Sequence, residues 1–157
     1  MTPLIMRDAR SADLPAVIAL LQDDDRGRLR EDPALPLDPG YLAAFAAIDA
    51  DPNQRLIVAE QDDAIVGTLQ LAFLPGLSYK GAWRGQIEAV RIAAAVRGRG
   101  LGTTLIAWAI DCCRDRGCRI VQLSSNAERT RAHAFYRQLG FVGSHIGMKL
   151  QIDRDFA

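Results

Sequence analysis

The chain contains the stretch Val90-Arg91-Ile92-Ala93-Ala94-Ala95-Val96-Arg97-Gly98-Arg99-Gly100-Leu101-Gly102-Thr103-Thr104-Leu105. An apolar run typical of a β-strand leads into an arginine and three alternating glycines, and an amphipathic helix follows. Glycine lets a backbone approach a ligand closely and adopt a positive φ. The first N–H groups of a helix have no partner within it and lie at the positive end of the helix dipole, so such a loop binds phosphate. The stretch therefore predicts a nucleotide- or coenzyme-binding protein and favours an enzyme.

The composition argues against several classes of partner. The chain has 19 basic and 19 acidic side chains, so its net charge gives no reason to expect a nucleic acid or a membrane surface. No apolar run approaches the ~18 to 20 residues that span a bilayer, and the first residues do not resemble a signal peptide. Cys112, Cys113 and Cys118 do not have the spacing of a metal site. We expect them to be reduced residues of a cytoplasmic protein that holds no metal.

Hydrophobic periodicity and turn residues predict an α/β protein with the element order β-α-α-β-β-β-α-β-α-β-β. The predicted strands are residues 4–7, 55–60, 64–71, 86–92, 119–124, 141–144 and 148–152. The predicted helices are residues 13–21, 41–49, 101–116 and 129–139, and residues 74–85 are expected to form a mobile loop. A strand meander followed by a β-α-β-α unit implies a central mixed sheet with helices on both faces. The last two strands are expected to close the sheet as an antiparallel pair.

Two common glycine-rich loops do not match the stretch. A P-loop requires a lysine after its last glycine, and no lysine lies near residues 98–102. A dinucleotide fingerprint requires Gly-x-Gly-x-x-Gly in the first β-α turn, whereas this loop has another spacing and lies deep in the chain. The remaining pattern is Arg97-x-x-Gly100-x-Gly102 after an apolar strand. With this signature the sequence resembles the GNAT superfamily of N-acetyltransferases, in which the signature holds the pyrophosphate of acetyl-CoA.

The second half of the chain strengthens the resemblance. Asn126 follows the end of a predicted strand, and Ala132-His133-Ala134-Phe135-Tyr136-Arg137-Gln138-Leu139-Gly140-Phe141 comes after it. This stretch is similar to a second signature of the family, which has an asparagine at a strand end, a helix with Ala-x-x-x-Tyr, and then Leu-Gly-Phe. Two motifs in the right order and in a matching strand–helix context are far more specific than one. The resemblance implies a single N-acetyltransferase domain, residues 1–157.

The resemblance also implies where the coenzyme binds. In the family the fourth and fifth strands separate, and the backbone groups freed in the gap bind the pantetheine arm and polarise the thioester. The matching contacts here are Val90, Arg91 and Ile92. The pyrophosphate is expected to bind the main chain of Arg97, Gly98, Arg99, Gly100, Leu101, Gly102 and Thr103, with arginines adding charge. Asn126 is expected either to bind the coenzyme arm or to cap the following helix.

Two residues are the candidates for proton transfer. Tyr136 matches the family's tyrosine near the coenzyme sulfur, and a phenol of pKa ~10 carries a proton that it can give to the departing thiolate. The alternative is a buried tyrosine with a purely structural role. Glu88 is the candidate base, acting directly or through water. Strand alternation predicts that it shares a face with Val90 and Ile92.

The acceptor is expected to bind near the first two helices and the segment before Glu88. The acidic run Asp23 to Asp25 either attracts a cationic amine or forms a solvated turn. Tyr79, Trp83 and Arg84 either cover the acceptor or, for Trp83, anchor the structure. His133 is expected on a helix surface near the coenzyme, and His145 either faces the acceptor pocket or is an ordinary polar residue.

These observations predict an acetyl-CoA-dependent acyltransferase that acetylates a primary amine of a small molecule in a direct ternary complex. No cysteine lies in either motif, which argues against a covalent acetyl-enzyme. Two alternatives remain open, a protein or peptide N-acetyltransferase and a non-catalytic acyl-CoA-binding module. The resemblance also implies a homodimer in which the closing strand pair takes part. The sequence does not identify the acceptor.

Overall fold

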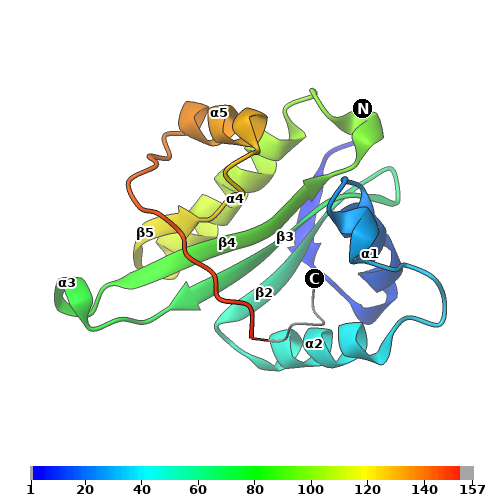
Figure 1. The fold of residues 1–157 in the computed structure, drawn as a ribbon, viewed down its shortest axis with the longest axis horizontal. Helices are drawn as coiled ribbons and strands as arrows, with labels where there is room; N and C mark the ends of the chain where they lie inside the picture. Colours follow the sequence, from blue (N-terminus) through cyan, green and yellow to red (C-terminus); the bar gives the residue numbers. More distant parts are fainter. Residues whose placement is uncertain (1, 153–157) are drawn as a thin grey trace.

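The computed structural model describes residues 2–152 and contains one five-stranded sheet in the order β1-β2-β3-β4-β5 (Figure 1). The first four strands pair antiparallel with their neighbours, and β5 pairs parallel with β4. The sheet is therefore mixed, as predicted. The strands are β1 (Ile5–Asp8), β2 (Gln54–Gln61), β3 (Ala64–Leu74), β4 (Trp83–Ile92) and β5 (Cys118–Leu123).

Helices cover both faces of the sheet, and each face has its own apolar core. On one face, α1 (Leu14–Gln22) and α2 (Pro39–Ala50) contribute Val17 and Phe45, which pack with Val58 of β2. On the other face, α4 (Leu101–Asp115) buries Leu105 and Ile106 against alternate residues of β2 and β3. The helix α5 (Thr130–Gln138) packs on the same side as α4 (Figure 1). The short helices are η1 (Ser11–Asp13), η2 (Gly27–Leu29), α3 (Ser78–Gly81) and η3 (Ala94–Val96).

Two irregularities of β4 determine which of its backbone groups are free on the β5 side and which face of the sheet each of its side chains occupies. Pairing with β5 ends at Ile87, opposite Leu123, although β4 continues to Ile92. Ala89 has a φ of 53°, and the register against β3 shifts at the same place. An extra residue in a strand moves the following side chains to the opposite face. The second half of β4 thus has an unpaired edge toward β5 and a reversed alternation.

The predicted fold class is confirmed, but the prediction of a closing strand pair is wrong. The nine predicted elements before residue 140 are present with ends shifted by at most three residues. Residues 141–152 form no strand, and β5 is an edge strand within the described residues. The segment's apolar side chains are 82% to 94% exposed at Val142, Ile146, Met148, Leu150 and Ile152. Their spacing suits a strand, but a hairpin that buries no apolar face and pairs with no third strand is marginal.

The connection between β3 and β4 is more ordered than predicted. Residues 74–85 were expected to be a mobile loop, but they extend both strands and hold the single turn α3. Tyr79 and Lys80 of this turn have left-handed φ angles of 53° and 61°. The turn lies at the end of the sheet remote from the glycine-rich loop (Figure 1).

Candidate active site

The glycine-rich loop leaves the end of β4 and turns into α4 at Gly100. Gly98 and Gly100 have φ angles of 78° and 80°, a conformation that few other residues adopt without strain. A Cβ at Gly102 would lie 3.4 Å from Phe135 and 3.8 Å from Ile92, which is ordinary van der Waals contact. The first two glycines thus shape the loop, whereas neither backbone conformation nor space requires glycine at position 102 in the protein alone.

This loop presents a row of free backbone donors. Helix α4 is 15 residues long, and its cap at Gly100 supplies no side-chain acceptor. The first backbone bond at this end runs from the N–H of Thr104 to the carbonyl of Gly100. Within residues 2–152, no hydrogen bond uses the N–H groups of residues 98–103. Free donors at the positive end of a helix dipole fit a pyrophosphate group.

The unpaired edge of β4 adds two further donors. The N–H of Ala93 donates to Val66 on β3, so backbone alternation directs the N–H groups of Val90 and Ile92 toward the β5 side. The carbonyls on that same edge are engaged. The carbonyl of Val90 accepts from the Arg91 guanidinium at 2.9 Å, and that of Ile92 accepts from Nε of Arg97 at 2.9 Å. An edge with free donors and capped acceptors suits a carbonyl oxygen that gains negative charge.

The bulge at Ala89 places Glu88 on a different face from the one predicted. Glu88 pairs with Gln70, which pairs with Leu56 on the α1 face of the sheet. Ile92 pairs with Gly67 on the α4 face, so Glu88 does not share a face with Ile92 or Val90. Instead, Glu88 and Arg91 project to the same side, toward α1. The positive φ of an alanine has no sequence signal, which is why simple alternation failed here.

Tyr136 lies on α5 inside an aromatic cluster. Its ring centroid is 5.2 Å from that of Phe135 and 5.8 Å from that of Phe141. Burial raises the pKa of the Tyr136 phenol above its ordinary value, and the charges of Arg129 and Arg91 oppose this effect. The phenol is therefore protonated at neutral pH.

The acidic run does not form the free acidic surface that the sequence suggested. Asp23 pairs with Arg97 at 2.8 Å, and Asp24 pairs with Arg91 at 2.9 Å. Asp24 also accepts from the N–H groups of Arg26 and Gly27. Burial opposes ionisation of Asp24, but the Gly27 N–H and the Arg91 charge outweigh it and hold the pKa of this carboxyl below its usual value.

These ion pairs fix residues 23–30 beside the site. The N-terminal part of the segment is tied to β4 and the glycine-rich loop, and Arg26 pairs with Glu128 before α5. A Cβ at Gly27 would lie 2.0 Å from the carbonyl oxygen of Leu21, so the segment also packs tightly on the end of α1. The segment thus forms one wall of the site. Sequence patterns gave no sign of these contacts, because each joins residues far apart in the chain.

Several predicted site residues have local structural partners. The side-chain oxygen of Asn126 accepts from the N–H of Glu128, and its carbonyl lies 2.9 Å from Nε2 of His133. These bonds form a turn before α5 and not a cap of the helix, because the N-cap of α5 is Arg129 and receives no side-chain hydrogen bond. Exposed His145 contacts the hydroxyl of Ser144.

Trp83, Tyr79 and Arg84 do not belong to this site. Trp83 stacks with the Arg116 guanidinium at 5.3 Å and packs against the core, which agrees with its anchoring role. It begins β4, whereas the glycine-rich loop follows the end of this 10-residue strand. A strand of that length separates the two places by ~30 Å.

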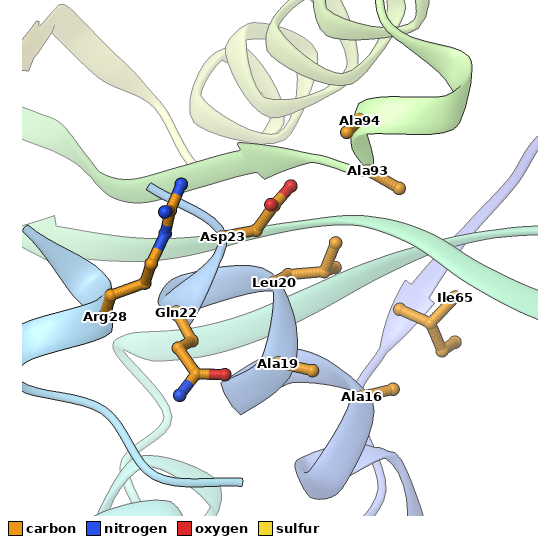
Figure 2. A pocket seen from close by; sticks show the side chains of 9 residues that line it. All are labelled: Ala16, Ala19, Leu20, Gln22, Asp23, Arg28, Ile65, Ala93 and Ala94. Carbon is orange, nitrogen blue, oxygen red and sulfur yellow. The ribbon is translucent and has the colours of Figure 1, made fainter. Parts of the chain in front are cut away.

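A hollow of about 450 Å³ lies beside the glycine-rich loop, between α1 and η3 (Figure 2). Figure 2 shows Ala16 and Ala19 of α1 on one side of it and Ala93 and Ala94 on the other. None of the described lining residues is a predicted catalytic residue or coenzyme contact. The lining residues are Ala16, Ala19, Leu20, Gln22, Asp23, Arg28, Ile65, Ala93 and Ala94.

Comparison with known proteins agrees with this geometry. The model of the acetyltransferase (GNAT) family matches residues 15–141, which include the glycine-rich loop, the unpaired half of β4 and Tyr136. The chain belongs to this family. It is an acyltransferase, and the family uses acetyl-CoA.

Three proteins to which the chain is similar each match most of its length. The crystal structure of a transcriptional regulator from Bacillus halodurans C-125 is 43% identical, with a TM-score of 0.92, over 96% of this chain and 100% of that one. The aminoalkylphosphonate N-acetyltransferase of Salmonella typhimurium is 29% identical over 90% of this chain and 86% of its own length. Glucosamine 6-phosphate N-acetyltransferase 1 of rice (Oryza sativa subsp. japonica) is 35% identical over 75% of this chain and 72% of its own.

None of the helices among residues 2–152 has both the length and the apolar character needed to cross a bilayer.

Proposed function

We propose that this GNAT protein transfers an acetyl group from acetyl-CoA to a primary amine of a small molecule, by direct attack in a ternary complex. The observation that carries the proposal is the unpaired half of β4, whose edge offers free N–H groups between the glycine-rich loop and Tyr136. Relatives that act on aminoalkylphosphonate and glucosamine 6-phosphate support a small amine as the acceptor.

Different residues bind different parts of the coenzyme. Main-chain N–H groups of residues 98–103 hold the pyrophosphate, because they are free and lie at a helix N-terminus. The N–H groups of Val90 and Ile92 stabilise the negative charge that develops on the thioester oxygen. Arg97 acts by shaping the loop, since its side chain joins the Ile92 carbonyl to Asp23.

The proton balance requires one acceptor and one donor. The acceptor attacks as a neutral amine, and as its nitrogen forms the new C–N bond it loses one proton, which Glu88 receives directly or through water. As the C–S bond breaks, the thiolate takes a proton from the Tyr136 phenol. Glu88 is exposed on the α1 face, so it is accessible to an incoming amine.

A covalent acetyl-enzyme would need an activated nucleophile, and the cysteines do not supply one. Burial raises the pKa of the Cys113 thiol to about 12, and burial also raises the pKa of Cys112 and of Cys118. A thiol is a poor nucleophile unless it is ionised. Direct attack by the amine is the simpler mechanism.

A small acceptor fits the site better than a peptide does. Residues 23–30 are held against β4 and the start of α5 by the pairs Arg91–Asp24, Arg97–Asp23 and Arg26–Glu128. These contacts narrow the approach to Glu88, whereas a peptide needs an open groove. We also do not favour a module that only binds acyl-CoA, because residues 23–30 leave both Glu88 and Tyr136 in place for catalysis.

An amine panel tests this proposal. The purified protein is incubated with acetyl-CoA and small primary amines, peptides or no acceptor, and free thiol is measured. We expect thiol release well above the no-acceptor rate for at least one small amine and none for peptides. Release with peptides alone would favour the protein acetyltransferase, and acetyl-CoA binding without release for any amine would favour the binding module.

The pH dependence of kcat gives a second test. The protonated form of Tyr136 is the active one, and its raised pKa keeps it protonated up to and beyond its ordinary value of ~10. We therefore expect kcat to show no fall on the alkaline side below about pH 10. A decline centred below pH 9 that disappears in Tyr136→Phe would contradict this assignment.

We further propose a single domain over residues 1–157, a cytoplasmic location and a homodimer. The location is inferred from three free thiols, which suit a reducing compartment. The dimer is inferred from the exposed apolar side chains of residues 142–152, which a partner surface would bury.

A further inference from the structure

Two arginines from separate segments meet at Asp24, on the face of β4 that carries Glu88. Arg91 belongs to the unpaired half of β4, and Arg129 comes directly before α5. The charges of Arg129 and Arg91 both oppose the rise in the pKa of Tyr136. The cluster therefore lies beside the candidate acid.

One carboxylate cannot balance this cluster. Asp24 lies 2.9 Å from Arg91 but 3.7 Å from Arg129, and its other oxygen is taken by two backbone N–H groups. Glu128 pairs with Arg26, and within residues 2–152 no ion pair joins Glu88 to either arginine. Two guanidinium groups thus share one oxygen of Asp24.

Several donors of the cluster remain free. The Arg91 side chain is only 12% exposed, and its Nε is buried without a hydrogen-bond partner in the described part of the chain. Within residues 2–152, the Arg129 side chain has one ion contact, to Asp24 at 3.7 Å. A buried cation with incomplete partners is costly, and it is stabilised when an anion binds next to it.

We propose that Arg129, supported by Arg91, binds an anionic group of the acceptor. The acceptor is then a small primary amine that also carries a phosphonate, phosphate or carboxylate. The planar fork of a guanidinium matches such oxyanions, and two forks fix the orientation of the molecule. With its anion held by the arginines, the acceptor directs its amine toward Glu88. This inference rests on the proposed acetyl transfer and names its substrate class.

Matched amines of similar length test the inference. 2-Aminoethylphosphonate, O-phosphoethanolamine and β-alanine carry an anion, and propylamine carries none. We expect kcat/KM for the best anionic amine to exceed that for propylamine by at least about 10-fold. The order among the three anionic amines identifies the group that binds.

Variants of Arg129 separate anion binding from a structural role. Arg129→Gln should raise KM for the best anionic amine by about 10- to 100-fold, while KM for propylamine and for acetyl-CoA stays unchanged. Arg129→Lys keeps the charge and should recover part of the loss. The control Arg114→Gln changes an exposed arginine of α4 that pairs with Asp111, and it should have no effect.

Three results would overturn the inference while leaving acetyl transfer intact. They are equal use of propylamine, an equal rise in KM for all amines in Arg129→Gln, and a loss of acetyl-CoA affinity in that variant. A loss of acetyl-CoA affinity in Arg129→Gln would mean that the arginines bind the coenzyme and not the acceptor. Thiol release with none of the amines would overturn the proposed function itself, and with it this inference.

Discussion

Replacing Gly100 with aspartate is expected to weaken acetyl-CoA binding by about 100-fold, whereas asparagine at the same position should weaken it by less than about 5-fold. Gly100 has a φ of 80° and caps α4. Asparagine and aspartate both tolerate this backbone region and both cap helices well. They differ in one negative charge, which repels a pyrophosphate bound at the same helix end. The pair thus isolates charge from strain.

Isothermal titration calorimetry with acetyl-CoA measures this difference. Thermal unfolding without coenzyme serves as the control, because a carboxylate at a helix N-terminus does not destabilise the helix. We expect both variants to be about as stable as the original protein. Equal affinities for the aspartate and asparagine variants would mean that no phosphate binds at this helix end.

Tyr136→Phe is expected to lower kcat by about 100-fold and to leave the affinity for acetyl-CoA nearly unchanged. The substitution removes only the hydroxyl, and the ring keeps its contacts with Phe135 and Phe141. If Tyr136 supplies the proton to the departing thiolate, its loss slows the chemical step and not binding. Steady-state kinetics with the best amine measures both quantities.

Tyr79→Phe provides a matched control for this variant. Tyr79 is 76% exposed in α3, at the other end of the sheet, so loss of its hydroxyl should not change kcat. Full activity of Tyr136→Phe, or an equal loss in both variants, would make Tyr136 a structural residue.

Local sequence features were sufficient to predict the glycine-rich turn and the helix after it, where we propose that the coenzyme binds. Glycines that need a positive φ, at Gly98 and Gly100, and an amphipathic helix from Leu101 leave a signal within about twenty residues. Tyr136 is likewise on a helix with clear periodicity, and the family resemblance indicated its place. The end of β4–β5 pairing at Ile87 was expected from that resemblance alone.

The arrangement that we propose for the acceptor could not be predicted, because it depends on contacts between distant segments. Asp24 meets Arg91 and Arg129 across 67 and 105 positions of the chain, and no local pattern reports such a pair. The bulge at Ala89, which puts Glu88 and Arg91 on the same face of β4, has no sequence signature either. The closing strands at residues 141–144 and 148–152 were predicted from alternating apolar and polar side chains. Such alternation does not show that a neighbouring strand is available for pairing.

The most direct test of the account follows the acetyl group itself. The protein is incubated with acetyl-CoA labelled with ¹³C in the acetyl group, first alone and then with the best amine, and intact-mass and product spectra are recorded. Direct transfer in a ternary complex predicts no labelled protein in the first step and one labelled N-acetyl product for each thiol released in the second. Labelled protein that gives up its acetyl group to the amine, or thiol release without acetylated amine, would contradict it.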